Sequence, residues 1–393
     1  MHRIVTTADW NFDLVYKKVN IQLFMKIFIL VFVIFTAVNA YLFWGGWRAL
    51  PKRKSVRIGY GIAFFVAYSS FIIAMLGRNI LPLEIQKIFY SIGTVWMGFM
   101  LYLTIWLLLS DLILLFFKKQ IRKSLRIWQM SIGYGLIIIV LAIGYYRFTH
   151  PQIVEQKISI ARSNAKYKSL KVVAVSDLHL GVANDKKRLQ QYVQLINNQH
   201  PDMIWIAGDV VDNNVLPLER ERMYEELNRL QSPLGTYMCL GNHEYLSGIK
   251  ASLDFLKKTN IHLLIDQAVQ IDSCFWIIGR DDSQRSLSRL PLSDLTGNLD
   301  KTQALFLLDH EPHHLEEAQA AGIDLQFSGH THEGQLWPFS LLTHVLFEKA
   351  HGYLRKGDTQ YYVSSGLGLW GPPFRIGTRS EVLVFEIGFS SFW

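Results

Sequence analysis

Five short polar segments between residues 177 and 332 contain residue types that bind divalent metal ions. Each segment follows an apolar run, and three of them begin with a glycine. They are Asp177-Leu178-His179, Gly208-Asp209-Val210-Val211-Asp212, Gly241-Asn242-His243-Glu244, the single His310, and Gly329-His330-Thr331-His332. Carboxylate, amide and imidazole groups without a thiolate suit a site for two divalent ions. Such a pair generates hydroxide from water near neutral pH and polarises a phosphoryl group, so the segments point to hydrolysis of a phosphate ester.

The segment around Asp209 is the centre of this pattern. Met203 to Ala207 is an apolar run that predicts a buried strand, and it stops at Gly208-Asp209. Open α/β sheets bind their ligands at the carboxyl ends of strands, so we place the candidate active site at Asp209. Asp177 and His179 are two residues apart and would project from one side of an extended backbone. The glycines let the backbone approach a crowded ion closely.

Alternating strands and helices must hold these segments in place. Strands are predicted at 170–176, 203–207, 236–240, 269–271, 274–278, 304–308, 325–327, 361–363 and 382–387. Helices are predicted at 185–198, with Asn184 or Asp185 as the cap, at 218–230, and at 312–321, with Pro312 near the first position. This alternation predicts an α/β domain over residues 169–393, in which five strands end in metal-binding residue types.

Together, the five segments resemble the pattern D-x-H, G-D-x-x-D, G-N-H-[DE], H and G-H-x-H of the calcineurin-like metallophosphoesterase superfamily, over residues 170–387. The resemblance implies two mixed β-sheets sandwiched by helices. It implies that one metal ion is held by Asp177, His179, Asp209 and His332. It implies that a second ion is held by Asp209, Asn242, His310 and His330, so that Asp209 bridges the two ions.

Three residues beside the ligands have other expected roles. His243 has no metal role in the family pattern. We expect it to contact the phosphate or to act as the general acid for the leaving alkoxide, which suits an imidazole near pH 7. Asp212 and Glu244 are expected to support the ligands or to stabilise turns.

The other histidines are weaker candidates. His313 and His314 compete with His310, but they fall in the first turn of a predicted helix, where solvated histidines are common. We therefore assign the ligand to His310. The histidines without a position at a strand end are expected at the surface or in the core: His200, His262, His344 and His351.

The segments His310-Glu311-Pro312, Gly366-Leu367-Gly368 and Gly371-Pro372-Pro373 resemble the bacterial membrane-anchored branch of that superfamily. In that branch the last metal segment usually continues with two glycines and a glutamine. Here it continues with Glu333-Gly334-Gln335. The loop beside the site therefore carries an extra carboxylate, whose role the sequence leaves open.

The first part of the chain is strongly apolar. Half of all residues are hydrophobic, only 18% are charged, and the mean hydropathy of +0.17 is unusual for a soluble enzyme. Apolar runs at 23–43, 58–76, 88–117 and 130–146 predict four transmembrane helices within residues 1–148. Aromatic residues lie near the ends of these runs, at Trp44, Trp47, Trp128, Tyr145 and Tyr146. A polar linker is predicted at 149–168.

Basic residues set the expected orientation of these helices. They cluster between the first and second runs, at Arg48, Lys52, Arg53, Lys54 and Arg57, and between the third and fourth, at Lys118, Lys119, Arg122, Lys123 and Arg126. The opposite side carries Arg3, Lys17, Lys18, Arg78, Lys87, Arg147, Lys157 and Arg162. The positive-inside rule places the two basic loops in the cytoplasm and the catalytic domain outside the cell membrane. Because the positive charge lies beside apolar segments, we expect contact with a bilayer and no nucleic-acid binding.

Two features leave alternatives open. Asp111 in the third run is either a functional group within the membrane or lies near the interface, because the helix ends near Ser110. The aromatic tail with Phe389, Phe392 and Trp393 either touches the bilayer or packs on its own domain. Cys239 and Cys274 form neither a metal-binding spacing nor a disulfide framework.

These observations predict a membrane-anchored phosphoesterase that uses two divalent ions and metal-activated hydroxide to hydrolyse a phosphodiester or phosphomonoester. Manganese is our first choice of metal, and iron or zinc remain open. The anchor would place the site near the bilayer, so lipid headgroups and cell-envelope intermediates are candidate substrates. Two competing hypotheses are a catalytically silent metal-binding receptor or scaffold and a transporter with an appended regulatory domain.

Overall fold

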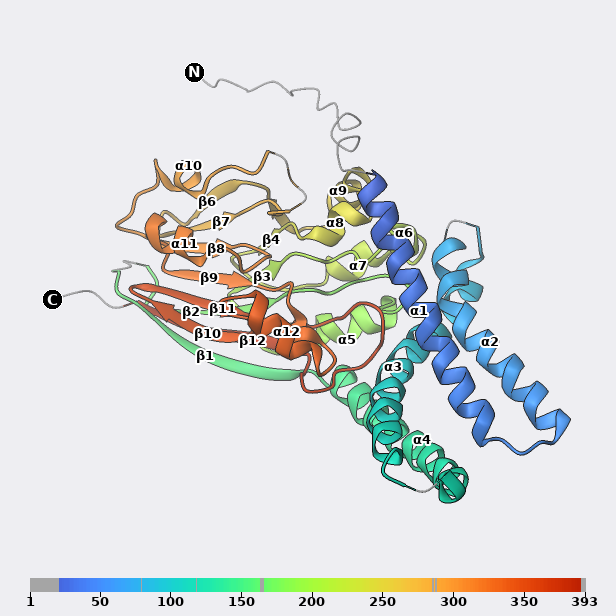
Figure 1. Cartoon of the computed structure of the whole chain (residues 1–393). Coiled ribbons are helices and arrows are strands. Elements are labelled where there is room, and N and C mark those ends of the chain that lie inside the picture. The colour runs from blue at the N-terminus through green and yellow to red at the C-terminus, as the bar shows by residue number, and fades with distance from the viewer. Residues whose placement is uncertain are drawn as a thin grey trace. The chain divides into compact units, whose positions relative to one another are not determined.

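The computed structural model of the chain describes residues 21–78, 80–117, 119–162, 166–284, 286 and 288–389 (Figure 1). Expectations for Arg3, Lys17, Lys18, Phe392 and Trp393 lie outside these residues, and no side chain is described for 118–123. The chain divides into two compact units. The first consists of residues 1–68 and 100–135, and the second of residues 69–99 and 136–393.

Four helices in the described part of the chain are long and apolar enough to cross a membrane. They are α1 (Ile21–Ala49), α2 (Lys54–Leu76), α3 (Leu83–Leu114) and α4 (Lys119–Thr149). This confirms the prediction of four apolar N-terminal helices. The helix ends differ from the apolar runs by several residues, because polar residues such as Lys54 are part of the helices.

Asp111 lies within α3 in the first unit. The hydroxyl of Tyr41 in α1 donates a hydrogen bond of 2.9 Å to its Oδ2 atom, and Gln129 of α4 donates one of 3.3 Å to Oδ1. The guanidinium of Arg126 is 3.6 Å from the same carboxylate. Helix α3 continues to Leu114, so Asp111 lies in its last turn, and both interpretations of this residue stay open. The partly exposed Asp111 thus contacts polar groups of both α1 and α4.

The described residues after α4 form two six-stranded mixed sheets (Figure 1). Across the first sheet the strands are β1 (Gln152–Ile160), β12 (Glu381–Phe389), β2 (Ser169–Val175), β3 (Met203–Ala207), β4 (Thr236–Cys239) and β5 (His262–Leu264). Across the second they are β10 (Gly352–Lys356), β11 (Thr359–Val363), β9 (Leu325–Ser328), β8 (Ala304–Leu308), β7 (Phe275–Gly279) and β6 (Gln267–Ile271). The strands β2 to β5 are parallel, as are β7, β8, β9 and β11. Parallel strands bring their carboxyl ends to one edge of a sheet, where a site can be assembled.

A hydrophobic core fills the space between the two sheets. The ring of Trp205 in β3 lies 5.2 Å from Phe306 in β8 and 6.0 Å from Phe385 in β12. Helices cover the outer faces: α5 (Lys186–Asn197) and α9 (Ile249–Leu256) share a core with β2 and β3, and α11 (Leu315–Ala321) shares one with β8. The predicted sandwich of two mixed sheets and helices is confirmed.

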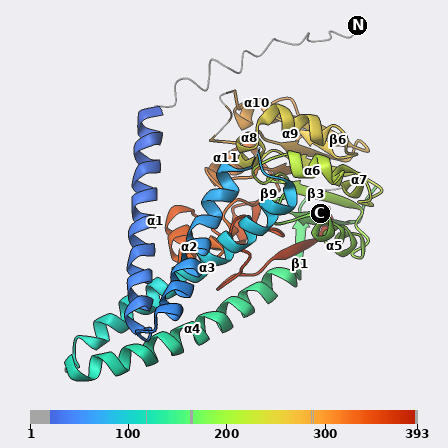
Figure 2. The same cartoon turned by 90° about the vertical axis from the view of Figure 1, so that its right-hand side faces the viewer.

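The polar linker predicted at 149–168 is wrong for residues 152–160. Residues 152–160 form β1, which pairs in parallel with β12 from Gln152↔Glu381 to Ile160↔Phe389. Figure 2 shows the chain passing from α4 into this strand. Ile158 and Ile160 are buried, whereas Lys157 and Ser159 between them are exposed. Alternation of this kind buries one face of an edge strand, and the polar residues on its other face make the segment resemble a linker.

Smaller differences concern the ends and number of elements. The helix predicted at 218–230 is two short helices, α6 (Leu216–Arg220) and α7 (Met223–Leu227), because Arg222 between them has φ 51°. The helix predicted from Pro312 begins only at Leu315. Prediction missed the strands β5 and β10 and the helices α8 (Asn242–Leu246), α9, α10 (Leu292–Thr296) and α12 (Phe339–Leu346). The Asp185 carboxylate caps α5, accepting a 3.1 Å hydrogen bond from the N–H of Arg188, as one of the two predicted caps.

Candidate metal centre

The predicted metal ligands lie just beyond the carboxyl ends of strands from both sheets. Asp177 and His179 follow β2, Asp209 follows β3, Asn242 follows β4, His310 follows β8, and His330 and His332 follow β9. Because these strands end at one edge of the sandwich, residues far apart in the sequence are brought into contact. The structure thus brings together all seven predicted ligands, and their assignment as ligands stays a prediction.

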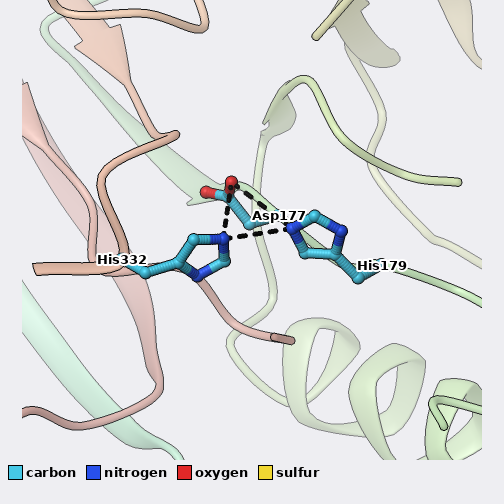
Figure 3. Close-up of side chains that lie close together, drawn as sticks. All are labelled: Asp177, His179 and His332. Atoms are coloured by element: carbon cyan, nitrogen blue, oxygen red, sulfur yellow. Dashed lines mark hydrogen bonds and ion pairs between the residues drawn. The ribbon is translucent and has the colours of Figure 1, made fainter. Parts of the chain in front are cut away.

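The first cluster consists of Asp177, His179 and His332, whose side chains point toward one another in Figure 3. The Nε2 atom of His179 is 3.8 Å from Asp177 Oδ1 and 3.1 Å from His332 Nε2. His332 Nε2 is 3.5 Å from the same carboxylate oxygen. All three side chains are buried. Two imidazole nitrogens that converge on one carboxylate inside the protein form a ligand set suited to a divalent cation.

Asp209 connects this cluster to a second one. Its Oδ2 atom is 3.7 Å from His179 Nε2 and 3.2 Å from His310 Nε2. Its Oδ1 atom accepts a 2.8 Å hydrogen bond from the backbone N–H of His243. Among the described residues, Asp209 contributes to two of the three groups of side chains whose donor atoms lie close enough to share an ion. One carboxylate therefore lies between both predicted sites.

The second ligand set surrounds His310 and His330. The rings of these two histidines are 5.2 Å apart, and the Nδ1 atom of His330 is 2.9 Å from the Oδ1 atom of Asn242. The Nδ1 atom of His310 is 2.7 Å from the carbonyl oxygen of Ala207 and donates to it. Its Nε2 atom is buried and has no hydrogen-bond partner in the described part of the chain. A ring fixed in this tautomer presents the Nε2 lone pair to a cation, so the donor set fits a metal ion.

The backbone of the ligands is strained. Asp177 (φ 55°), His179 (φ 44°), Asp209 (φ 53°), His330 (φ 70°) and His332 (φ 49°) all have left-handed backbone conformations. Side chains at such positions cost about 1–2 kcal/mol each, and such strain is typical of functional sites. The expected extended backbone at Asp177 and His179 is therefore wrong, although their side chains still meet.

The glycines of the motifs allow close approach, as predicted. A Cβ atom on Gly208, which has φ 71°, would lie 2.6 Å from the Nδ1 atom of His310. A Cβ atom on Gly241 would overlap the carboxylate of Asp209. Only a residue without a side chain leaves these ligands where they are.

Glu244 holds two of the metal-binding loops. It is fully buried, and its carboxylate accepts hydrogen bonds from the backbone N–H groups of Asp209 (3.0 Å), Val211 (3.0 Å) and Gly241 (2.8 Å). Burial and the charge of Asp209 raise the pKa of Glu244 to about 7, and the backbone donors oppose this shift. Cations bound to Asp209 would further favour the charged form. The predicted supporting role of Glu244 therefore has a physical basis.

Asp212 lies between two histidines of the site. Its Oδ1 atom is 3.5 Å from the Nδ1 atom of His179 and 3.5 Å from that of His243. A carboxylate behind a metal-binding imidazole orients the ring. The Nδ1 atom of His243 also donates a 2.6 Å hydrogen bond to the Asp212 carbonyl. Burial lowers the pKa of His243, but the carboxylates of Asp209 and Asp212 raise it to about 9.

Several residues that support the site were not predicted. Arg375 is fully buried, and its guanidinium donates to the carbonyl oxygens of His332 (3.1 Å), Gly366 (2.9 Å) and Gly368 (2.7 Å). The buried Glu311 has its Oε1 atom 3.8 Å from His330 Nε2. Glu311 directly follows the predicted ligand His310 in the sequence, and this position could have identified it as a residue of the site. Nothing in the spacing of the sequence marks Arg375.

The extra carboxylate of Glu333 pairs with a histidine that is not a predicted ligand. It lies 3.6 Å from the Nδ1 atom of His351, whose Nε2 atom is 3.2 Å from Glu381 Oε1. Glu333 has φ 51°, a conformation that glycine adopts without cost. His351, expected at the surface or in the core, thus binds two carboxylates beside the metal loop.

The competitors of His310 lie elsewhere. The ring of His313 stacks on Phe347 at 4.7 Å, and His314 is exposed and pairs with Glu316 at 3.3 Å. Neither is part of the groups of potential metal ligands among the described residues. The geometry therefore favours His310 as the ligand.

The chain is similar to several known proteins. A family model described as calcineurin-like phosphoesterase matches residues 170–334. An uncharacterized metallophosphoesterase of Campylobacter jejuni is 30% identical over 387 residues, which cover 93% of this chain and 99% of that protein. A transmembrane protein with metallophosphoesterase domain from Danio rerio is 29% identical over 59% of this chain and 56% of its own length. Among solved structures, a dimetal phosphatase from Danio rerio has a TM-score of 0.36 and 10% identity, over 55% of this chain and 98% of that one.

Proposed function

The chain belongs to the calcineurin-like phosphoesterase family. We propose that it is a membrane-anchored hydrolase of phosphate monoesters or diesters that uses two divalent ions. The observation that carries the proposal is the position of Asp209. One carboxylate lies within 3.7 Å of His179 in the first ligand set and 3.2 Å of His310 in the second. A shared carboxylate of this kind is the central requirement of a two-metal site.

Each residue of the site has a separate proposed role. Asp177, His179, Asp209 and His332 would hold one ion, and Asp209, Asn242, His310 and His330 the other. When bound, such ions supply hydroxide near neutral pH and neutralise charge on phosphoryl oxygens. His243 donates a proton to the leaving oxygen, because its Nδ1 atom is engaged by the Asp212 carbonyl and leaves Nε2 for the substrate. Asp212 and Glu244 keep the histidines and loops in place.

We infer that manganese is the preferred ion, with iron or zinc as alternatives. The ligand set contains carboxylates, an amide and imidazoles, and it contains no thiolate to favour zinc. Metal analysis of the purified protein decides between these ions.

The catalytic domain is proposed to face the outside of the cell membrane. The basic residues of the α1–α2 connection support this orientation through the positive-inside rule. Protease added to intact cells should then cleave the catalytic domain. Complete protection in intact cells, with cleavage after lysis, would reverse the orientation.

Hydrolysis of a chromogenic phosphodiester by the purified full-length protein tests the proposed activity. His330→Ala and Asp209→Asn should abolish Mn²⁺-dependent turnover while circular dichroism shows an unchanged fold. A scaffold or receptor without catalysis would show no turnover in the wild type either, and the complete ligand set argues against that alternative.

A further inference from the structure

We propose that helix α12 lies in the surface of the bilayer at the mouth of the metal centre, and that the ester hydrolysed there is carried on a membrane lipid. The inference rests on the proposed hydrolase function and names the substrate class for that same site. Three observations support the inference: the apolar side chains of α12 are exposed, the end of α12 contacts a residue of the proposed metal site, and the start of α12 is connected to two membrane-capable helices. All of these contacts lie within the second unit.

Helix α12 exposes its apolar side chains to an unusual degree. None of its eight residues, all of which the structure describes, is buried. The exposed fractions are 61% for Leu341, 54% for Leu342, 81% for Val345 and 61% for Leu346. Trp337, just before the helix, is 47% exposed. A contiguous apolar patch of this kind marks an interaction surface, and an apolar helix with a flanking tryptophan is typical of the membrane interface.

The end of α12 touches the metal centre. Phe347, which follows the helix, stacks on His313, and its ring lies 6.0 Å from the predicted ligand His330. The side chain of His330 is 23% exposed, whereas that of His310 is 1% exposed. The site is therefore more open at His330, and α12 borders this opening.

The start of α12 is tied to the membrane helices by the segment 371–377. The N–H of Trp337 donates a 2.7 Å hydrogen bond to the carbonyl of Ile376. The neighbouring N–H of Arg375 donates a 3.0 Å hydrogen bond to the carbonyl of Gly144 in α4. Gly144 lies within the membrane-capable part of α4, at 124–149. One short segment thus binds both the start of α12 and a membrane helix.

The same segment inserts an aromatic side chain between two membrane helices. Phe374 is 5% exposed. A Cβ atom on Gly98 of α3 would lie 2.8 Å from its ring, and one on Gly144 of α4 would lie 3.2 Å from its Cβ atom. The bilayer that surrounds α3 and α4 therefore adjoins α12 as well. This continuity identifies lipid as the occupant of the exposed helix face, and lipid headgroups are the phosphate esters within reach of the site.

The first experiment compares two substrates with one set of variants. Full-length protein is placed in vesicles of phosphatidylcholine with about 10% phosphatidic acid. Hydrolysis of the lipids is followed by mass spectrometry of their products, and hydrolysis of a soluble chromogenic ester is measured separately. The variant L342Q/V345Q/L346Q makes α12 polar. Leu290→Gln is the matched control, because Leu290 is 44% exposed and lies outside α12, on the connection between β7 and α10. If other lipid esters are the substrate, extracted membrane lipids replace phosphatidic acid in the same assay.

The expected result separates the two substrates. The triple variant should lose about 10-fold or more of the lipid activity, because it removes the apolar groups that enter the bilayer. It should keep its activity on the soluble ester within about twofold, as expected for surface substitutions, and so should Leu290→Gln on both substrates. Equal effects on both substrates, or none on either, would overturn the inference.

The second experiment measures the position of α12 without catalysis. Val345→Cys is made in a Cys274→Ser background, where Cys239 is buried and unreactive, and is labelled with an environment-sensitive fluorophore. In vesicles that contain brominated lipids, the fluorophore at 345 should be quenched, whereas one at Leu290→Cys should not. Equal fluorescence in brominated and ordinary vesicles would overturn the inference. So would disulfide-linked dimers through residue 345, which would identify a second copy of the chain as the occupant.

The outcomes also distinguish this inference from the proposed function. If the wild type hydrolyses no ester of any kind with Mn²⁺, the proposed hydrolase function fails. If it hydrolyses the soluble ester, cleaves no lipid ester in extracted membrane lipids, and shows no quenching at residue 345, the hydrolase function stands and the membrane-surface role of α12 fails.

Discussion

The Nε2 atom of His310 lies 3.2 Å from the Oδ2 atom of Asp209, and both side chains are buried. The other ring nitrogen of His310 is engaged by the carbonyl of Ala207, so Nε2 is the ring nitrogen left to bind a cation. This relationship places an imidazole from the second sheet against a carboxylate from the first. It explains why the two sheets must meet at this edge for the site to exist.

His310→Ala should remove one ligand of the second ion only. We expect the metal content after equilibration with Mn²⁺ to fall to about one ion per chain, with activity lost, since in-line hydrolysis requires both ions. Metal analysis by mass spectrometry measures this. His314→Ala is the control, because His314 is exposed and pairs only with Glu316. An unchanged metal content in His310→Ala would mean that another residue, such as Glu311, holds the second ion.

Glu244→Gln should destabilise the protein and weaken metal binding. The carboxylate accepts three backbone N–H bonds, and a glutamine amide would turn its own donor toward one of these N–H groups. A buried donor left without an acceptor costs about 1–3 kcal/mol, which thermal or urea unfolding would detect. Loss of such a supporting contact lowers metal affinity by about 10–100-fold. Glu386→Gln on the exposed face of β12 is the control, and equal behaviour of the two variants would contradict the account.

The reaction of His243→Gln should depend on the leaving group. A general acid matters most when the leaving alkoxide is a strong base, so hydrolysis of an alkyl ester should fall by about 10²–10⁴. Hydrolysis of a nitrophenyl ester should fall much less, because nitrophenolate leaves without a proton. The metal content should not change. An equal loss on both esters would show that His243 contacts the phosphate and does not donate the proton.

The His351 site should make stability depend on pH. Burial lowers the pKa of His351, but its hydrogen bond with Glu381 and the charge of Glu333 raise it above the usual 6.5. Because the pKa of His351 is raised in the folded state, the protonated ring contributes its full stabilisation below about pH 6.5. This stabilisation is lost as the pH rises through the pKa of the folded state. The difference in Tm between the wild type and His351→Gln should therefore shrink across that interval. A difference that grows with pH would contradict the assigned pair.

The clustering of the proposed ligands could be predicted from the sequence because their residue types and positions are encoded locally. Asp177, Asp209, Asn242 and His330 each follow an apolar run that forms a strand, so the type of residue and its position at a strand end are both visible. The left-handed backbone of Asp177 was not predicted, because motif spacing says nothing about φ. That conformation is maintained by distant hydrogen bonds, such as the 3.1 Å bond from the Asp177 N–H to the Gly208 carbonyl.

Other features depend on contacts that are remote in sequence. The guanidinium of Arg375 donates to the backbone carbonyl oxygen of His332. Because every residue type has this carbonyl, the residue at position 332 does not reveal the contact. The strand β1 was mistaken for a linker, because its register with β12 pairs residues more than half the chain apart. Residues 152–160 therefore form a strand because they pair with β12, and the local sequence pattern does not show this pairing.

The most direct test of the central claim is the metal content of Asp209→Asn. If Asp209 bridges both ions, this single substitution should remove or greatly weaken both sites, so that the protein retains almost no Mn²⁺ after dialysis. His179→Ala and His310→Ala should each retain about one ion under the same conditions. Retention of one tightly bound ion by Asp209→Asn, with circular dichroism equal to that of the wild type, would contradict the bridging role.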